Sequence, residues 1–305
     1  MGGGLYRRTL LSITGNKLVE HLSIRYGRKL ASKFIAGDNL EEAMDRTEEL
    51  NNQGIMVTLD HLGEGIKDLK EAEGYRDEYL KIVREIAKRK ANANVSLKPT
   101  QFGLALDKEQ CHANIRAVVS EAKYSRIFVR LDMEDTPYTQ ATIDLVRRLH
   151  AGWMTNCGTV IQAYLFRSED DVQALSKEKV NLRLVKGAYK EPPEVAYQSA
   201  GQVLDNFKKL IEHRLTKGVY TAVASHDDKV INWTKDFAAA NHISKDAFEF
   251  QMLYGLRMGK QAELAQEGYR VRCYVPYGTM WYPYYTRRLA EKPANLILVL
   301  KNALK

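Results

Sequence analysis

Short apolar runs alternate along the chain with longer amphipathic segments. The runs are rich in β-branched residues, which favour strands. The segments between them, among them Ala72–Lys90, Thr139–Leu149 and Val195–Leu215, repeat apolar residues at the spacing of about 3.6 that is typical of helices. Eight runs are of the strand type: Gly54–Leu59, Ala93–Leu97, Ile127–Asp132, Thr159–Leu165, Leu182–Val185, Tyr220–Ala224, Phe248–Leu253 and Val271–Val275.

This alternation predicts eight βα units and therefore a parallel sheet. Eight such units within about 250 residues are typical of a closed barrel. A doubly wound nucleotide-binding sheet is less consistent with the chain, because no G-x-G-x-x-G motif follows the first run and Gly255–Lys260 misses the P-loop spacing by one residue. The expected fold class is α/β, a (β/α)8 TIM-like barrel with extra N-terminal helices.

The residues before the first predicted strand form a region of their own. We predict that residues 1–53 are an N-terminal helical extension and that residues 54–305 are the barrel. The last helix of the extension is expected to begin at Asp38, since a short polar residue followed by Glu41 and Glu42 is typical of a helix N-terminus. Gly54 is its expected stop.

Composition narrows the class of protein. With 45% hydrophobic, 28% charged and 9% aromatic residues, the chain resembles a soluble globular enzyme and not a disordered or collagen-like protein. Its three cysteines are odd in number and widely spaced, which excludes a disulfide framework and favours a reducing compartment. No apolar run approaches the roughly 18 residues of a membrane helix, and no secretory signal is evident. A cytoplasmic location is therefore expected.

The formal net charge of +8 suits an anionic partner. Nucleic acid is not favoured, because the 46 basic residues are mixed with 38 acidic ones and form no recognition motif. A membrane surface is a second possibility, since leucines are interleaved with the basic residues of Arg7–Lys33 in the manner of an amphipathic surface helix. A helical cap packed on the barrel explains the same pattern.

Polar residues stand at the carboxyl ends of nearly all predicted strands, where barrel enzymes carry their chemistry. Those at strand ends are Asp60, His61, Lys98, Asp132, Glu134, Lys186 and His226; those within strands are Gln162, Arg183, Glu249, Gln251 and Tyr274. Arg183 and Gln162 interrupt otherwise apolar runs. A charge inside a barrel strand requires a partner or a ligand, because desolvating it costs several kcal/mol.

Two local motifs point to anion binding. After the fifth predicted strand, Lys186 is followed by the small residues Gly187 and Ala188, which allow a phosphate to approach the backbone N–H groups. The alternative is a plain turn with a solvated lysine. Near the C-terminus, Arg287 and Arg288 follow an aromatic cluster and are suited to a small carboxylate. The alternative there is an ordinary basic pair on a surface helix.

Other chemistries remain open at this point. Lys98 or Lys186 would form a Schiff base if desolvation lowered its pKa. His226 is compatible with a base, a metal ligand or a buried hydrogen-bonded residue, and metal is not expected because no second histidine stands at ligand spacing. A serine hydrolase lacks its nucleophile elbow.

Seven segments together resemble the proline dehydrogenases, FAD enzymes that start proline catabolism. They occur in family order from about Gly54 onward: Val95–Lys98, Leu131–Glu134, Ile161–Tyr164, Leu182–Tyr189, Ala224–His226, Phe248–Gly255 and Tyr284–Glu291. The short chain resembles the monofunctional bacterial enzymes more than the long bifunctional fusions. Compared with the fusions, Lys190 replaces an aromatic residue and Asp227 replaces an asparagine, so the adenine end of the cofactor site is expected to differ.

The resemblance implies a role for each matching residue. Substrate-binding residues would be Lys98, Arg287 and Arg288 at the proline carboxylate, and Leu253, Tyr274 and Tyr284 around the ring. Arg183 would lie at the flavin N5 edge, with Asp132 as the carboxylate that fixes the cations. Cofactor-binding residues would also include Met133, Gln162, Lys186, Gly187, Ala188, Ser225 and His226, with Glu291 supporting the arginine pair.

The resemblance also implies an activity. L-Proline would give Δ1-pyrroline-5-carboxylate by hydride transfer to FAD, and the electrons would pass to a membrane quinone, with the enzyme peripheral to the inner face of the cell membrane. Two alternatives remain. One is a flavin barrel of the folate-reductase kind with a nicotinamide donor, and the other is a cofactor-free Schiff-base aldolase.

Overall fold

The computed structural model describes residues 33–63 and 65–291, and for 287–291 it describes the backbone alone. Eight parallel strands close into a barrel in chain order, and β1 completes the ring by pairing with β8. The strands are β1 Met56–His61, β2 Ala93–Leu97, β3 Val129–Leu131, β4 Cys157–Gln162, β5 Asn181–Val185, β6 Thr221–Ala224, β7 Phe248–Leu253 and β8 Arg270–Tyr277. The predicted (β/α)8 barrel is confirmed.

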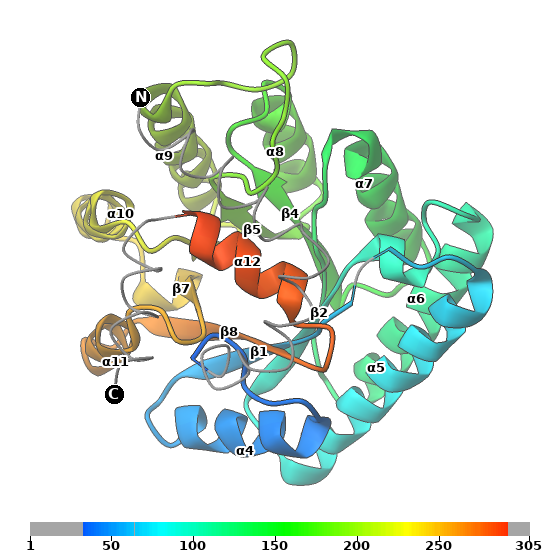
Figure 1. Ribbon diagram of the computed structural model, residues 1–305. Coiled ribbons are helices and arrows are strands. Elements are labelled where there is room, and N and C mark those ends of the chain that lie inside the picture. Colours follow the sequence, from blue (N-terminus) through cyan, green and yellow to red (C-terminus); the bar gives the residue numbers. More distant parts are fainter. Residues whose placement is uncertain (1–32, 64, 292–305) are drawn as a thin grey trace.

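Helices surround the barrel on the outside (Figure 1). They are α5 Leu69–Arg89, α6 Lys108–Tyr124, α7 Thr136–Ala151, α8 Ser168–Lys177, α9 Ala200–Thr216, α10 Asp228–Ala240 and α11 Met258–Gln266, with the short 3-10 turns η1 Pro99–Phe102 and η2 Lys245–Ala247. Two further helices complete the described chain. Helix α4, Leu40–Asn51, packs on β1 and β8, and helix α12, Tyr282–Glu291, crosses the open mouth of the barrel (Figure 1).

The longest helix shows why these segments are helical. Asp68 caps α5 by accepting hydrogen bonds from the backbone N–H groups of Lys70 and Glu71, a contact that stabilises a helix by about 1 kcal/mol. The buried residues of α5 are Ala72, Tyr79, Ile82, Val83 and Ile86, which form one stripe facing the barrel. The helix ends at Lys90, which adopts the left-handed conformation.

Two predicted helix starts are wrong. Helix α4 is capped by Asn39 and not by Asp38: the Asn39 side chain accepts from the Glu42 backbone N–H at 3.0 Å. Both residue types cap well, so the sequence alone does not choose between them. Helix α9 begins at Ala200 and not at Val195, because the backbone around Ala196 pairs instead with Leu165 of the loop after β4.

The predicted division at residue 53 stays a prediction, because residues 1–32 lie outside the described residues. Helix α4 accounts for the end of the extension, and Gly54 with φ +75° ends the turn that follows it, as predicted. No helix in the described part of the chain is long and apolar enough to cross a membrane.

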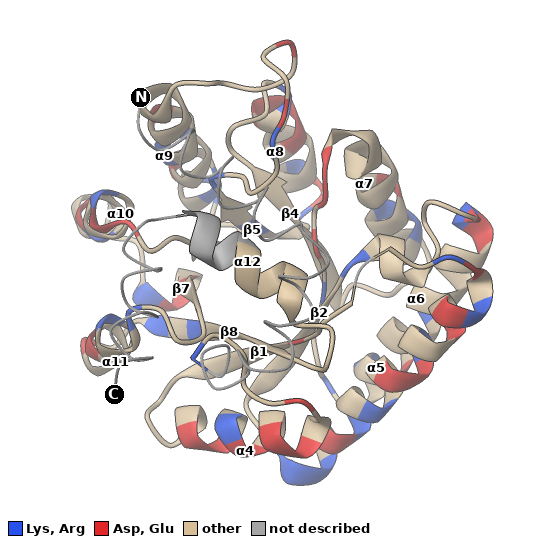
Figure 2. Ribbon diagram, in the orientation of Figure 1, with Lys and Arg blue, Asp and Glu red and all other residues tan. Residues whose placement is uncertain are grey.

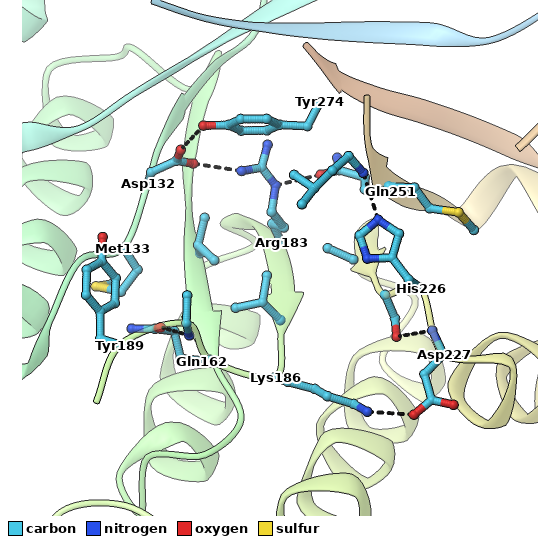
Figure 3. A pocket seen from close by; sticks show the side chains of 18 of the residues that line it. Asp132, Met133, Gln162, Arg183, Lys186, Tyr189, His226, Asp227, Gln251 and Tyr274 are labelled. Atoms are coloured by element: carbon cyan, nitrogen blue, oxygen red, sulfur yellow. Dashed lines mark hydrogen bonds and ion pairs between the residues drawn. The ribbon is translucent and has the colours of Figure 1, made fainter. Parts of the chain in front are cut away.

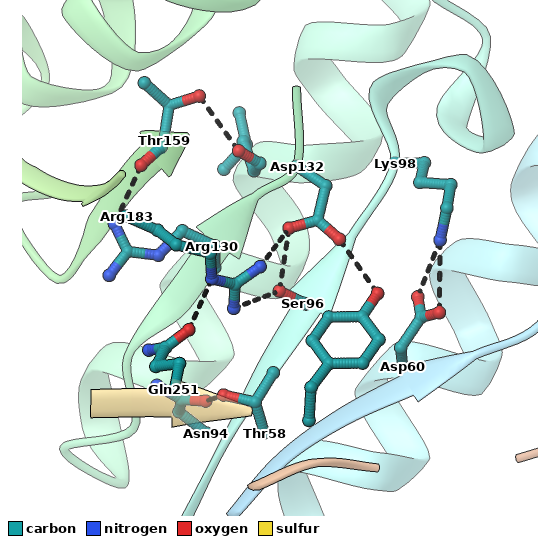
Figure 4. Close-up of polar contacts among 12 residues, drawn as sticks. Thr58, Asp60, Asn94, Ser96, Lys98, Arg130, Asp132, Thr159, Arg183 and Gln251 are labelled. Atoms are coloured by element: carbon teal, nitrogen blue, oxygen red, sulfur yellow. Dashed lines mark hydrogen bonds and ion pairs between the residues drawn. The ribbon is translucent and has the colours of Figure 1, made fainter. Parts of the chain in front are cut away.

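The interior of the barrel is unusually polar. Side chains alternate between the two faces of a strand, and here the apolar set, such as Val57 and Leu59 of β1, is buried against the helices. The other set includes buried polar residues that make hydrogen bonds, several of which are drawn in Figure 4. They are Thr58, Asp60, Asn94, Ser96, Arg130, Asp132, Arg183, Glu249 and Gln251.

Outer charges are mixed in sign. Figure 2 shows acidic and basic residues interspersed along helices such as α5 and α6. Many pair across neighbouring helices, as Arg84 does with Glu121 at 2.8 Å and Arg148 with Glu109 at 2.7 Å. Each of these pairs places a carboxylate beside a basic side chain and so offsets its charge locally.

Candidate active site

A cavity of about 500 Å3 opens at the carboxyl ends of the strands. The predicted site residues that line it come from separate elements: Lys98, Asp132, Met133, Gln162, Arg183, Lys186, Gly187, Ala188, Ser225, His226, Leu253, Tyr274 and Tyr284. The fold thus brings together every predicted site residue whose side chain is described. Arg287, Arg288 and Glu291 lie on α12, and their side chains are outside the described residues.

Arg183 is held at the centre of the cavity floor (Figure 3). Its Nη1 donates to Asp132 Oδ1 at 2.7 Å, its Nη2 to Ser96 Oγ at 3.1 Å and its Nε to Gln251 Oε1 at 2.5 Å. The guanidinium carbon also lies 5.3 Å from the centroid of the Tyr274 ring. Acceptors on two edges fix the plane of the guanidinium, so this charge has one position toward the cavity.

Asp132 is the acceptor that joins this group. Besides Arg183, it accepts from Ser96 Oγ at 3.0 Å and from the Tyr274 hydroxyl at 2.9 Å. Burial and the Asp132 carboxylate raise the pKa of Tyr274 well above its ordinary value. Tyr274 therefore stays protonated and donates to Asp132 over the ordinary pH range.

Lys98 projects from the end of β2 and pairs with Asp60 of β1. Its Nζ lies 3.0 and 3.1 Å from the two Asp60 oxygens; the Asp60 side chain is buried and that of Lys98 is partly buried. Burial alone would lower the pKa of Lys98, but the carboxylates of Asp60 and Asp132 outweigh it and raise that pKa above the ordinary value. An ammonium held protonated is poorly suited to Schiff-base chemistry, and it is a good partner for an anion.

The Lys186–Gly187–Ala188 turn lies on the opposite side of the cavity. Gly187 has φ +125°, and a Cβ there would lie 2.5 Å from the Tyr164 ring, so the position requires glycine. Lys186 is not a lysine surrounded by water only, because its ammonium group donates to Asp227 Oδ2 at 2.6 Å. This contact lowers the pKa of Asp227, so the pair is charged on both sides.

Gln162 and His226 connect the strand ends to these loops. Gln162 donates to the Glu134 carbonyl at 2.9 Å and accepts from the Ala188 N–H at 3.2 Å. His226 Nε2 accepts from the Leu253 N–H at 3.0 Å, so the neutral ring carries its proton on Nδ1. His226 is thus hydrogen-bonded, but it is half-buried and lines the cavity instead of being enclosed in the core. The described residues contain no cluster that would hold a metal ion.

The aromatic cluster that precedes Arg287 and Arg288 lines the cavity only in part. Of the four aromatic residues around Pro283, all of them described, Tyr284 lines the cavity, whereas Trp281, Tyr282 and Tyr285 do not. All four pack with Phe34 and Ile35 in one apolar cluster, so Tyr284 belongs to this cluster and also lines the cavity. The cluster seats α12 on the segment before α4, since the Tyr285 and Phe34 ring centroids are 6.1 Å apart.

Sequence reasoning did not assign several lining residues. They are Val160, Val185, Tyr189, Ala224, Asp227, Gln251 and Met252. Gln251 carried a usable signal, because it is a polar residue within an apolar strand and has the same parity as the predicted Leu253. Tyr189 carried one as well, since it ends the glycine turn that begins at Lys186.

Known proteins match this arrangement. Residues 43–299 match the proline dehydrogenase family. Proline dehydrogenase 1 of Bacillus subtilis (strain 168) is 43% identical over 302 residues, which are 99% of this chain and 100% of the relative. Proline dehydrogenase of Deinococcus radiodurans is 39% identical, over 99% of this chain and 98% of the relative.

A solved structure agrees at the level of the fold. Proline utilization A of Bdellovibrio bacteriovorus, inactivated by N-propargylglycine, superposes with a TM-score of 0.82 at 26% identity. The match covers 92% of this chain and 34% of that longer protein. With a barrel of this kind, a cationic cavity at its mouth and full-length relatives of one activity, the chain belongs to the proline dehydrogenase family.

Proposed function

We propose that the protein oxidises L-proline to Δ1-pyrroline-5-carboxylate with FAD as cofactor and a membrane quinone as final acceptor, the first step of proline degradation to glutamate. The observation that carries this proposal is the set of cations around one cavity. Arg183 is buried and Lys98 partly buried, each paired with a carboxylate, and Lys186 stands at the rim. This arrangement suits two anionic ligands, a small carboxylate and a cofactor phosphate.

The turn at Gly187 supports FAD as the cofactor. The Tyr164 ring fills the space of a side chain at Gly187, which explains the glycine. Gly187 and Ala188 line the cavity, so a phosphate-bearing group can lie against this turn. In our assignment Met133 and Gln162 contact the isoalloxazine, Lys186, Gly187 and Ala188 the pyrophosphate side, and Ser225 and His226 the flavin and ribityl region.

Lys98 is the proposed anchor of the proline carboxylate, with Arg287 and Arg288 as its partners. Its pairing with Asp60 keeps the ammonium charged and directed from the strand end. The backbone of α12 brings the arginine pair to the barrel mouth, next to Tyr284, which lines the cavity. Leu253, Tyr274 and Tyr284 would enclose the pyrrolidine ring.

When bound, FAD supplies the hydride acceptor for the ring carbon next to the proline nitrogen. The chain's own residues orient the substrate and select its protonation state. Lys98 and Arg183, with the arginine pair of α12, disfavour a further positive charge on the amine, and the carboxylates of Asp60 and Asp132 oppose part of this effect. Asp132 already accepts from Arg183, Ser96 and Tyr274, so we assign the released proton to solvent.

The visible spectrum of the purified protein tests this function. A bound-flavin spectrum that bleaches with anaerobic L-proline is the expected result. A flavin that ignores proline but is reduced by NADH would support the folate-reductase alternative. A protein that takes up no flavin, even when FAD is added back, and is trapped with substrate by borohydride would support the aldolase.

Membrane contact is a separate proposal that rests on the basic stretch Arg7–Lys33, most of which lies outside the described residues. We propose a cytoplasmic enzyme, peripheral on the inner face of the cell membrane. Deletion of residues 5–32 should abolish binding to liposomes of anionic lipid, and unchanged binding would contradict the proposal. The deletion stops at residue 32 because Phe34 and Ile35 are buried against α12.

A further inference from the structure

We propose that Glu249 is a positioning residue for Arg183 and acts through the side-chain amide of Gln251. This inference rests on the proposed function, in which Arg183 lies at the reactive edge of the flavin. Glu249 itself lies one layer deeper in the barrel than the cavity and is 2% exposed. In our assignment Glu249 contacts neither proline nor FAD.

The three side chains form a continuous path. Glu249 and Gln251 are two residues apart on β7 and face the same side of the sheet. The Gln251 amide nitrogen donates to Glu249 Oε1, and its carbonyl oxygen accepts from Arg183 Nε at 2.5 Å. The upper contact, between Gln251 and Arg183, appears in Figures 3 and 4.

The direction of the Gln251 amide is dictated by its neighbours. An arginine Nε can only donate, and an ionised carboxylate can only accept. Gln251 must therefore present its oxygen to Arg183 and its nitrogen to Glu249. A neutral residue at position 249 that could also donate would be compatible with either orientation of the Gln251 amide. In the reversed orientation, the NH2 group of Gln251 would face the Arg183 N–H.

Glu249 is built to remain an acceptor. Arg272 pairs with it through Nε at 2.9 Å and Nη2 at 3.1 Å, and the Tyr220 hydroxyl donates at 2.8 Å. Burial opposes ionisation, but these contacts outweigh it and lower the pKa of Glu249 to about 2. The carboxylate is charged at every pH at which an enzyme of this kind would work, so the amide has one orientation.

The consequence for Arg183 is a fixed guanidinium plane. Asp132 and Ser96 hold its Nη atoms, and Gln251 is the acceptor for Nε. Without that acceptor the side chain keeps its contacts with Asp132 and Ser96 but loses the one that fixes its Nε edge. Loss of Glu249 should therefore impair the chemical step and leave proline binding nearly unchanged.

An exchange of the two side chains provides the sharpest test. Glu249→Gln should lower kcat about tenfold or more with KM changed less than about twofold, the scale of one hydrogen bond to a charged group. In the double variant E249Q/Q251E, the amide at position 249 donates to the carboxylate at position 251, which again accepts from Arg183. The amide oxygen still accepts from Arg272 Nη2 and the Tyr220 hydroxyl, and only Arg272 Nε loses its acceptor. This variant should recover most of the lost kcat. A purely structural role for Glu249 gives no such recovery.

Two further variants keep the proposal testable if E249Q does not fold. Gln251→Met leaves the Glu249–Arg272 pair intact and should reproduce the kcat loss, with a more negative flavin midpoint potential because the cation is less well placed. Tyr220→Phe is the matched control: it removes one hydrogen bond to the same carboxylate and should leave kcat unchanged.

Each outcome has one interpretation. Wild-type kcat in folded E249Q or Q251M, or a double variant no faster than E249Q, would overturn the role of Glu249. Failure of L-proline to bleach the flavin of the wild-type protein would instead overturn the proposed function, whatever the variants do.

Discussion

Asp132 and Arg183 meet at 2.7 Å across the barrel floor, although 51 positions separate them in the chain. Asp132 follows β3 and Arg183 lies within β5, so neither side chain has a local partner. Their pairing explains how a barrel strand tolerates an arginine: the charge is neutralised by a carboxylate that is itself buried, with Ser96 and Tyr274 as additional donors.

Asp132→Asn should be costly for both stability and activity. The amide keeps the volume but leaves the buried Arg183 without its counter-charge, which destabilises a protein by about 3–5 kcal/mol. We expect a fall in melting temperature and a loss of kcat/KM of about a hundredfold, measured by thermal unfolding and by proline-dependent flavin reduction. Tyr274→Phe, which removes only one donor to Asp132, should have the milder effect on stability. Equal melting temperatures for D132N and wild type would contradict the assigned role of this pair.

The stability contribution of Glu249 should depend on pH in a defined direction. Its contacts lower the pKa from the ordinary 4.5 to about 2, so the folded state binds its proton less well than the unfolded state. The contribution is then complete above about pH 5 and is lost as the pH falls toward 2. Two to three pKa units correspond to stabilisation on the order of 3 kcal/mol.

Urea unfolding of wild type and E249Q across this range measures the effect. The difference in free energy of unfolding between the two proteins should be constant from pH 5 to 7 and should shrink below pH 4.5. A difference that stays constant down to the acid limit would show that Glu249 is not held ionised by the fold.

The barrel and most of the residues that line the cavity could be predicted from the sequence for a physical reason. Parallel strands buried on both faces must be apolar and β-branched, so they stand out as short runs, and closure brings all their carboxyl ends to one mouth. Lys98, Gln162 and Tyr274 could therefore be assigned to one site without knowing any contact between them. The helix boundaries were predicted less accurately, as Asn39 and Ala200 show, because they depend on which of several equivalent hydrogen bonds is made.

Which side chains contact each other could not be predicted from the sequence. The pairing of Lys98 with Asp60, or of Arg272 with Glu249, depends on strand register, which no local pattern encodes. The apolar cluster of Trp281 with Phe34 was missed for the same reason, since it joins opposite ends of the chain. Polar residues inside strands signalled that partners must exist, and only the closed barrel identified them.

Gly187→Ala tests whether the turn beside Lys186 is a cofactor cradle. The added Cβ would meet the Tyr164 ring at 2.5 Å in a conformation that alanine rarely adopts. We expect FAD affinity to fall at least tenfold, measured by titration of the apoprotein. Gly74→Ala is the control, since nothing lies within 4 Å of a Cβ there and the position is inside α5. That substitution should leave FAD affinity unchanged and stabilise the fold by about 0.5–1 kcal/mol.

Asp227→Asn should strengthen cofactor binding. In the apoprotein the Lys186 ammonium is paired with Asp227 at 2.6 Å, so an incoming phosphate must compete with a carboxylate and approach its negative charge. An asparagine removes that charge, and it caps α10 about as well as the aspartate, which accepts from the Lys229 N–H. Because both side chains are partly exposed, we expect a gain of about threefold to tenfold in FAD affinity, larger at low salt.

Asp228→Asn is the matched control, because it removes a neighbouring charge that pairs with Arg257 and should change FAD affinity little. Weaker FAD binding in D227N than in D228N would mean that Asp227 orients Lys186 for the phosphate and does not compete with it.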